Sequence, residues 1–355
     1  METLSESIAE TGAPVSWRET SAREIREIVP TVSVLMIVYN QESYLAEAIG
    51  SIVSQRCPFP FELVIGDDAS ADGSLQIALD YQRRFPSIVR VLHGGDNLGM
   101  NGNSRRVRSA ARGDLLAWCE GDDYWCDNRK LAMQEAVLRA DDSVGAVHTD
   151  WARSQFQWGR WRVDWGRTSH RGVPRQLLSG DLLPTFHNPL ILRTCTLLFR
   201  RSIADQVDRS VFGQRDYDFG DAVTALFITA GHRVAHVPAT MAVYRVSPQS
   251  ALRSGVASRI RFLKSSLAFD EDARRFMRDD RRYPAAYRWE LLVGLALWSC
   301  RARDLPSFKM ALRGLWSDFS AGEFAGAAIR TIWMRRRWPA SKSQMPPPAF
   351  RSGTP

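Results

Sequence analysis

TVSVLMIVYNQESYLAEAIGSIVSQ, residues 31–55, is the stretch that decides the fold. Residues 31–39 are β-branched and almost entirely apolar, which is typical of a strand buried on both faces of a parallel sheet. Residues 41–55 carry apolar side chains at helical spacing, among them Leu45, Ile49 and Ile52. A buried strand followed at once by an amphipathic helix predicts the first half of a right-handed βαβ unit.

The same alternation continues down the chain. We expect strands at residues 61–66, 87–93 and 114–120, and helices at residues 72–85 and 103–112. Asp72 is the expected N-cap of the first of these helices, and Gly113 ends the second. Strands and helices in regular alternation predict an α/β fold around a mostly parallel sheet.

Polar side chains follow the expected strands at their carboxyl ends. They are Tyr39 and Asn40, Asp67 and Asp68, Asp96 and Asn97, and Asp122 and Asp123. Open parallel sheets bind ligands at this edge, so a site is predicted there. The sequence has neither a GxGxxG turn nor a GxxxxGK[ST] loop, which argues against dinucleotide and P-loop chemistry.

CEGDDYW, residues 119–125, crowds Glu120, Asp122 and Asp123 into four positions. Carboxylates this close repel one another and usually need a cation, a proton or an arginine. Hard oxygen ligands of this kind suit Mg²⁺ or Mn²⁺ and leave positions open for phosphate oxygens. An adjacent Asp pair also fits a helix cap or a solvated surface, so its place at a strand end carries the metal interpretation.

Composition limits the class of protein. The chain has 355 residues, of which 45% are hydrophobic and 24% are charged, and this is ordinary globular composition. Its five cysteines include no CxxC pair, which favours free thiols in a reducing compartment. The N-terminus does not read as a signal peptide, and the apolar run at residues 291–300 is about half of a membrane span. We therefore expect a cytoplasmic protein.

The net charge of +8 is concentrated in the last third, where 20 Lys and Arg face 9 Asp and Glu from residue 251 onward. No nucleic-acid-binding motif accompanies this charge, so we expect no nucleic-acid partner. Residues 323–338 (EFAGAAIRTIWMRRRW) predict an amphipathic basic helix. Such a helix fits peripheral contact with anionic lipid on the inner face of the membrane, or packing against the rest of the chain with a solvated basic edge.

Several motifs occur in an order that resembles the family-2 glycosyltransferases of the GT-A fold, in particular bacterial enzymes of surface-polysaccharide synthesis. The motifs are SVLMIVYNQESYLAEAIGSIVSQ, FELVIGDDASADGS, NLGMNGN, GDLLAWCEGDDYWCDNRKLAMQ and FGDAVTALFITAGHRVAHVPATMAVYRV. The resemblance covers roughly residues 31–248. It implies a nucleotide-diphosphate-sugar transferase fold, a Rossmann-like mixed sheet flanked by helices. It also implies metal-assisted, inverting hexosyl transfer to a saccharide or lipid-linked acceptor.

With this resemblance we expect four segments. They are a flexible arm at 1–29 with one short helix, a catalytic domain at 30–250, a helical basic region at 251–338 and a disordered tail at 339–355. Within the second, residues 151–170 predict a hairpin or flap and residues 193–201 a strand. Residues 217–246 predict an acidic turn, a helix to about Ala230 and two strands.

The resemblance also implies donor contacts. Tyr39 would stack on the base of a donor expected to be UDP-linked, beside Asn40, and Asp68 would accept a ring N–H with Asp67 adjacent. Asp122 would touch the ribose or sugar and Asp123 would ligate the metal. The helix contacts expected near the phosphates or sugar are Asn101, Asn103, Arg105 and Arg106. A strand-end core position for Tyr39, a turn cap for Asp68 and a solvated face for the helix residues stay open.

On the acceptor side, the resemblance makes Asp221 the catalytic base, at a helix start where the dipole favours its ionised form. Tyr124 and Trp125 would form the acceptor floor, with His148 and Asp150 lining the same cleft. The alternatives are a plain N-cap for Asp221, helix-start packing for Tyr124 and Trp125, and a satisfied core position for His148. Two departures from the family pattern are Gly220 before Asp221, where many members have Glu, and Ser247, where many carry His close after Tyr-Arg.

Two other functions fit parts of the pattern. A sugar nucleotidyltransferase also uses a parallel sheet and acidic metal ligands, but it would need a Gly-rich basic loop where this chain has VYNQESY. A non-catalytic relative that binds nucleotide or glycan would not need the acids at 68, 122, 123 and 221.

Overall fold

The computed structural model describes residues 3–4, 7–8, 14–15, 17–165, 170–188, 190–246, 255–278 and 280–317. The described chain forms two compact units. The first holds residues up to 182 together with 188–214 and 221–246, and the second holds residues 183–187, 215–220 and those from 247 onward. Two short segments that lie before the predicted boundary near residue 250, residues 183–187 and 215–220, therefore belong to the second unit.

Four parallel strands form the centre of the first unit: β5 (Val32–Val38), β6 (Phe61–Asp67), β7 (Val89–Gly94) and β8 (Leu115–Trp118). They pair in the order β7-β6-β5-β8. The chain moves outward from β5 to β7 and then returns to the other side of β5. This reversal places the carboxyl ends of β5 and β8 beside each other, where α/β sheets form their ligand crevice.

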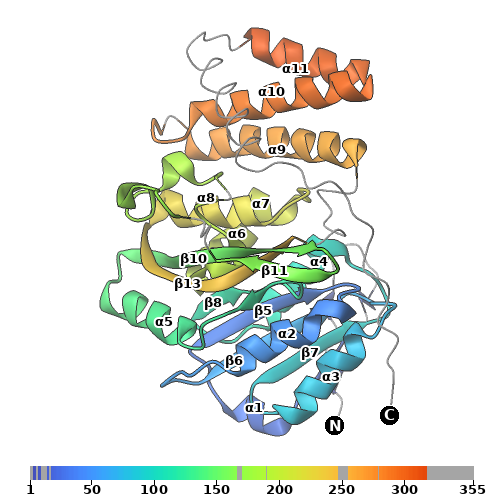
Figure 1. Ribbon diagram of the computed structural model, residues 1–355, viewed down its shortest axis with the longest axis vertical. Coiled ribbons are helices and arrows are strands. Elements are labelled where there is room, and N and C mark those ends of the chain that lie inside the picture. The colour runs from blue at the N-terminus through green and yellow to red at the C-terminus, as the bar shows by residue number, and fades with distance from the viewer. Residues whose placement is uncertain are drawn as a thin grey trace. The chain divides into compact units, whose positions relative to one another are not determined.

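Helices cover this sheet, as the sequence predicts. In Figure 1, α2 (Glu42–Val53) and α3 (Ser74–Arg84) lie together over one face of the strands. Asp72 accepts hydrogen bonds from the backbone N–H groups of both Glu42 and Ser74, so it serves the start of both helices. The next helix, α4 (Gly99–Ala110), packs on β5 and β6, and a Cβ at Gly66 would lie 2.3 Å from the Asn103 amide oxygen.

The sheet continues beyond β8 with mixed directions. β12 (Leu198–Arg200) pairs antiparallel with β8, and then come β10 (Val144–Gln157), β13 (Arg233–Val246) and the short β9 (Tyr124–Trp125). The strand predicted at 193–201 is shorter than expected because a 3₁₀ turn (η3, Thr194–Thr196) precedes it. The remaining helices of this unit are α5 (Lys130–Ala140), α6 (Arg201–Arg209), α7 (Val211–Gln214) and α8 (Asp221–Gly231).

The predicted hairpin after residue 150 is confirmed. β10 pairs antiparallel with β11 (Arg160–Asp164), and the turn residues Trp158 and Gly159 both have positive φ, as the tightest hairpin turns require. The two strands expected before residue 246 are instead one strand, β13, parallel to β10. Shifts in register opposite Asp150 interrupt this pairing, and they lie around Pro238, which has no N–H to donate.

The N-terminal arm was predicted to be loose apart from one short helix. The short helix is confirmed, but the strand before it was not predicted. β4 (Trp17–Thr20) pairs antiparallel with β7, and α1 (Arg23–Glu27) follows it. The short β1 (Thr3–Leu4) pairs with β4, while β2 (Ser7–Ile8) and β3 (Pro14–Val15) pair with each other. An added strand satisfies the backbone groups that the edge of β7 would otherwise expose.

The second unit is helical, with α9 (Val256–Met277), α10 (Ala285–Ala302), α11 (Leu305–Ser317) and a 3₁₀ turn, η2 (Leu183–Thr185). Its core is an aromatic cluster of Phe186, Tyr217, Phe219, Phe269, Tyr283 and Tyr287. None of the helices that the structure describes is long and apolar enough to cross a membrane. The amphipathic helix predicted at 323–338 and the tail at 339–355 lie outside the described residues.

A buried charge network joins the amino ends of the central strands. Glu62 is 1% exposed and accepts from Ser33 Oγ at 2.7 Å, from Arg90 at 3.0 Å and from Arg112 at 2.7 Å. Burial alone would raise the pKa of Glu62, but these partners outweigh it and hold the pKa below its ordinary value. Arg90 also forms a two-point pair with Glu19 of β4, so the network fastens the edge strand to the sheet.

Replacing Glu62 should therefore destabilise the fold. We expect Glu62→Gln to lower the free energy of unfolding by about 3 kcal/mol at pH 7, because the buried Arg90 and the part-buried Arg112 lose this shared carboxylate and Arg90 keeps only Glu19. A lowered folded-state pKa contributes stability above the unfolded pKa and loses it as the pH falls through the folded pKa. The gap between wild type and variant should thus close below about pH 4, as followed by urea unfolding at several pH values.

Asp80→Asn is the matched control, because Asp80 belongs to an exposed ion pair with Arg83. It should change stability by less than about 0.5 kcal/mol. Equal effects of the two substitutions would contradict a structural role for the buried network.

Candidate functional site

The three clustered carboxylates lie in a tight turn directly after β8. Gly121 N–H donates to the Ile37 carbonyl of β5, and Asp123 N–H donates to the Glu120 carbonyl at 3.0 Å. A Cβ at Gly121 would lie 2.2 Å from the Gln41 side-chain oxygen, so the turn needs glycine to pass this close to α2. Glu120, Asp122 and Asp123 are thereby held together at the switch point of the sheet.

The site is rich in negative charge for its degree of burial. Burial, together with the charges of Asp122 and Glu120, raises the pKa of Asp123 well above its ordinary value. Burial, and then Asp122 and Asp221, raise the pKa of Glu120 to about 7. In the described part of the chain, Glu120 Oε2 is buried with no hydrogen-bond partner. This arrangement is stabilised by protons or by an added cation.

Arg245, near the end of β13, organises the turn without neutralising it directly. Its backbone N–H donates to Asp123 Oδ1 at 2.8 Å, and its Nη1 donates to the Asp122 carbonyl at 2.8 Å. The guanidinium group lies about 5 Å from the rings of Tyr44, Tyr124 and Trp161 and forms its ion pair with Glu47. Arg245 was not among the predicted site residues, although a Tyr-Arg pair closing a buried strand was a visible signal.

A second arginine, Arg193, supplies positive charge beside Glu120. Its guanidinium carbon lies 4.2 Å from the centre of the Tyr244 ring and 4.9 Å from that of Trp151, and its charge lowers the pKa of Glu120. Arg193 was predicted only as the first residue of a strand at 193–201. No spacing rule connects it to residue 120, because the sheet pairing brings the two together.

Asp221 is the first residue of α8, and its side chain is exposed. Its carboxylate accepts from the Ala222 N–H at 2.8 Å, and its charge helps to raise the pKa of Glu120. The structure therefore brings Asp221 close to the carboxylates after β8. A helix start favours the ionised form of an acid at this position.

The predicted donor residues follow β5 and β6. Tyr39 is 52% exposed, and Asn40 has φ of 54° and accepts from the Ala71 N–H. Asp68 is buried and accepts from the Leu98 N–H at 2.8 Å, and burial raises its pKa. Asp67 is also buried, and within the described residues its Oδ1 has no hydrogen-bond partner.

The predicted contacts on α4 differ in accessibility. Asn103 is 2% exposed, and its amide bonds the Gly66 carbonyl and the Arg106 guanidinium. Arg106 is buried as well and donates to the Asp67 carbonyl at 2.6 Å. Both side chains hold α4 on β6, whereas Arg105 is exposed and its donor contact stays a prediction.

The predicted acceptor residues separate in the same way. Tyr124 is half-buried, while Trp125 is 4% exposed, with its indole N–H donating to the Cys195 carbonyl. His148 has no exposed surface and lies with Asp150 in a histidine cluster formed with His170 and His236. Full burial favours interior roles for Trp125 and His148, which were the alternatives left open.

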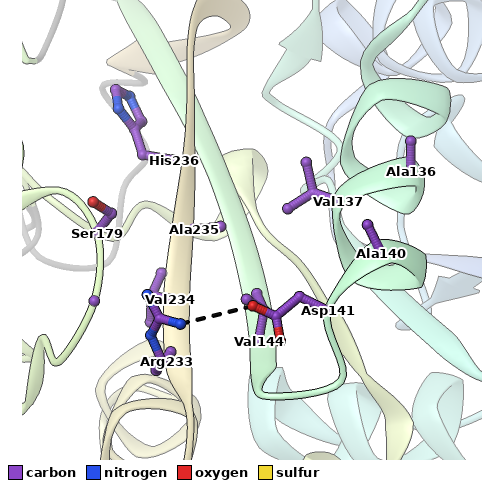
Figure 2. Close-up of a pocket in the computed structure, with 11 residues that line it drawn as sticks. Ala136, Val137, Ala140, Asp141, Val144, Ser179, Arg233, Val234, Ala235 and His236 are labelled. Atoms are coloured by element: carbon purple, nitrogen blue, oxygen red, sulfur yellow. Dashed lines mark ion pairs between the residues drawn. The ribbon is translucent and has the colours of Figure 1, made fainter.

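A pocket of about 530 Å³ lies beside α5 and the start of β13. Figure 2 shows Ala136, Val137 and Asp141 on one side of it and Arg233 and His236 on the other. None of the acids after β6 or β8 lines this pocket. Its lining holds a single ion pair, Arg233 with Asp141, and we assign it no part in the chemistry of the carboxylates.

The carboxylates after β8 suit a divalent metal. They offer hard oxygen atoms, one of them the orphaned Glu120 Oε2, in a site whose raised pKa values show uncompensated negative charge. Asp122 keeps partial exposure, whereas Asp123 is 3% exposed and has one oxygen engaged by Arg245. The donor set therefore fits Mg²⁺ or Mn²⁺.

Solved structures include similar folds. A mannosyltransferase from Pyrobaculum calidifontis, solved with GDP-Man and Mn²⁺, has a TM-score of 0.50 and 19% identity, with coverage of 90% of this chain and 85% of that one. Likeness at this identity concerns the fold alone. The fold is GT-A, a mixed sheet flanked by helices with helices following it, as predicted.

Sequence comparisons give the family. EpsH of Bacillus subtilis, named as a candidate glycosyltransferase, is 34% identical over 239 residues, which are 64% of this chain and 67% of EpsH. Rv1520, an uncharacterized protein of Mycobacterium tuberculosis, is 32% identical over 240 residues, which are 65% of this chain. The match spans 63% of the length of Rv1520. The profile of Glycosyl transferase family 2 matches residues 33–207, and the chain belongs to that family.

Proposed function

We propose that this chain transfers a sugar from a nucleotide-diphosphate donor to a hydroxyl group of a saccharide or lipid-linked saccharide, with inversion at the anomeric carbon. The observation that carries the proposal is the cluster of Glu120, Asp122 and Asp123 at the switch point of the sheet, with Asp221 near enough to Glu120 to help raise its pKa. Family membership supports transferase chemistry over the nucleotidyltransferase alternative.

Donor binding is assigned to the loops after β5 and β6. Tyr39 has the exposure needed to stack on a base, and Asp68 lies at the neighbouring strand end with its carboxylate partly held by the Leu98 N–H. Asn40 and Asp67 support these two loops through hydrogen bonds to Ala71 and Ser70. A UDP-linked donor remains the expectation.

Asp122 and Asp123 would hold the divalent metal, with Glu120 beside them. When bound, the metal supplies positive charge to the diphosphate that leaves the sugar. The protein's part is to keep the carboxylates converged, and Arg245 does so through the Asp123 side chain and the Asp122 carbonyl.

Asp221 is proposed to act as the general base. Its exposed carboxylate takes the proton of the acceptor hydroxyl, whose oxygen then attacks the anomeric carbon from the face opposite the diphosphate. At the anomeric carbon, the bond to the acceptor oxygen forms as the bond to the nucleotide diphosphate breaks, so the configuration inverts. The half-buried Tyr124 would form part of the acceptor floor. A lipid-linked acceptor would suit a role in surface-polysaccharide synthesis at the inner membrane face.

Removing the proposed base should separate transfer from donor binding. We expect Asp221→Asn to lower kcat by about 10²- to 10⁴-fold, the usual range for a lost general base. The donor Kd should change by less than about threefold, since Asp221 is not assigned to the donor. Calorimetry with a panel of nucleotide sugars and a transfer assay measure the two quantities separately.

The control is Asp208→Asn, an acid of α6 paired with Arg108, which should leave both quantities near wild type. Full turnover in Asp221→Asn would refute the base assignment. If the wild-type protein binds none of the nucleotide sugars, a different function for the whole site is favoured.

The metal assignment has its own test. Asp123→Asn should weaken Mn²⁺ binding by more than roughly 100-fold. Loss of a residue that only hydrogen-bonds to a metal ligand typically weakens binding by roughly 10- to 100-fold. Asp127→Asn, a change at an acid paired with Arg129 nearby in sequence, should not alter Mn²⁺ affinity. Calorimetric titration of Mn²⁺ measures this, and equal affinities in the two variants would place the metal elsewhere.

A further inference from the structure

A second cluster of metal-ligating side chains lies between β10, β13 and the connection that follows β11. His148 of β10, His170 and His236 of β13 each offer a ring nitrogen, and these atoms all lie within 4.8 Å of one another. The three ring centres are separated by 4.8–5.2 Å. His148 and His236 are direct partners in the parallel pairing of the two strands.

The hydrogen bonds of His148 leave one of its nitrogens without a role in the protein. Nε2 lies 2.6 Å from the Leu178 carbonyl oxygen, so it carries the proton and donates it. Nδ1 then carries no proton and has a free lone pair, and it is buried with no hydrogen-bond partner among the described residues. Burial lowers the pKa of His148 to about 3, which keeps this lone pair available at neutral pH.

His170 shows the same pattern. Nε2 lies 2.9 Å from the Leu190 carbonyl oxygen and 3.1 Å from that of Ile191, which requires an N–H there. In the neutral ring, Nδ1 therefore carries a lone pair and no proton, yet it lies 2.6 Å from Asp150 Oδ1. Two acceptors at this distance repel each other unless a proton or a cation joins them.

Asp150 completes the cluster. Its Oδ1 also lies 2.9 Å from His236 Nε2, so two imidazole rings meet one carboxylate oxygen. The irregular register of β13 opposite Asp150 is the kind of distortion that turns a strand side chain toward a site.

We propose that His148, His170 and His236, with Asp150 as the fourth ligand, bind a zinc-class divalent cation. A proton on His170 would satisfy its contact with Asp150 but would leave His148 Nδ1 without a partner, whereas one cation satisfies both. Imidazole nitrogens and carboxylate oxygens are both ligands that Zn²⁺ takes in proteins. Ring N–H groups donated to backbone carbonyls are the usual outer contacts of such ligands.

The geometry sets what binding requires. Zn–N bonds of about 2.1 Å in a tetrahedron place the ligand atoms about 3.4 Å apart. Ring nitrogens as much as 4.8 Å apart must therefore approach by up to about 1.4 Å, and Asp150 Oδ1, now 2.6 Å and 2.9 Å from two of them, must move away. His236 is also one of the residues that line the pocket beside α5 (Figure 2). Four protein ligands leave no open position, so the role is structural: the cation ties His170 to β10 and β13.

This site is independent of the carboxylates after β8 and of the proposed transferase activity. The test is the metal content of the full chain after incubation with Zn²⁺ and desalting. We expect about one zinc per chain, a rise in Tm that EDTA reverses, and visible absorption bands typical of four-coordinate Co²⁺ when Co²⁺ replaces Zn²⁺.

His170→Ala should lose most of the bound zinc and the Co²⁺ bands. His232→Ala, a change at a histidine outside the cluster, should keep both. Asp123→Asn should also keep the zinc, which separates this site from the carboxylates. Because His170→Ala could fail to fold, Asp150→Asn, which keeps the shape of the side chain, serves as a second variant with weakened zinc retention.

Two results would overturn the proposal. One is folded wild-type protein that retains no zinc and shows no four-coordinate Co²⁺ spectrum, which would leave a purely protonic histidine–aspartate cluster. The other is zinc retained equally by wild type, His170→Ala and Asp150→Asn.

Discussion

The repulsion among three carboxylates at the end of one buried strand is the constraint on which the site depends. Glu120, Asp122 and Asp123 sit where the sheet gives them little water, and the raised pKa values of Glu120 and Asp123 record the cost. Such a cluster persists only if the surrounding fold holds it in place. Gly121 allows the tight turn, and Arg245 fastens its backbone and one of its side chains.

The sheet topology supplies these contacts from distant parts of the chain. The pairing of β5 with β8 brings the loop after β5 close to the turn that holds Glu120, Asp122 and Asp123. β13 pairs with β9, and this places Arg245 beside the same turn. The same strand carries His236 nearer its start, where it pairs with His148 of β10. A distortion of β13 would therefore be felt at both the carboxylates and the histidine cluster.

The sequence predicted the features that depend on local pattern. The strands β5 to β8 are mainly apolar, and the polar residues that follow them, Asp68 and Asp123 among them, lie where the geometry of parallel sheets predicts a site. Arg193, Arg245 and the histidine cluster depend on which strands pair across the sheet, and no spacing within the sequence encodes that pairing. β4 was missed because a four-residue edge strand has too little apolar pattern to distinguish it from a loose arm.

The placement of the two arginines explains how the acidic site can remain open to a cation. An arginine that formed a two-point pair with Asp123 would occupy the oxygens that a metal needs. Arg245 instead lies among aromatic rings and pairs with Glu47, while Arg193 lies against Trp151 and Tyr244. Positive charge is thus held near the carboxylates while an oxygen of Glu120 stays unpartnered within the described residues. The histidine cluster differs in chemistry, since its donors are mainly imidazole nitrogens, and the two sites should therefore prefer different cations.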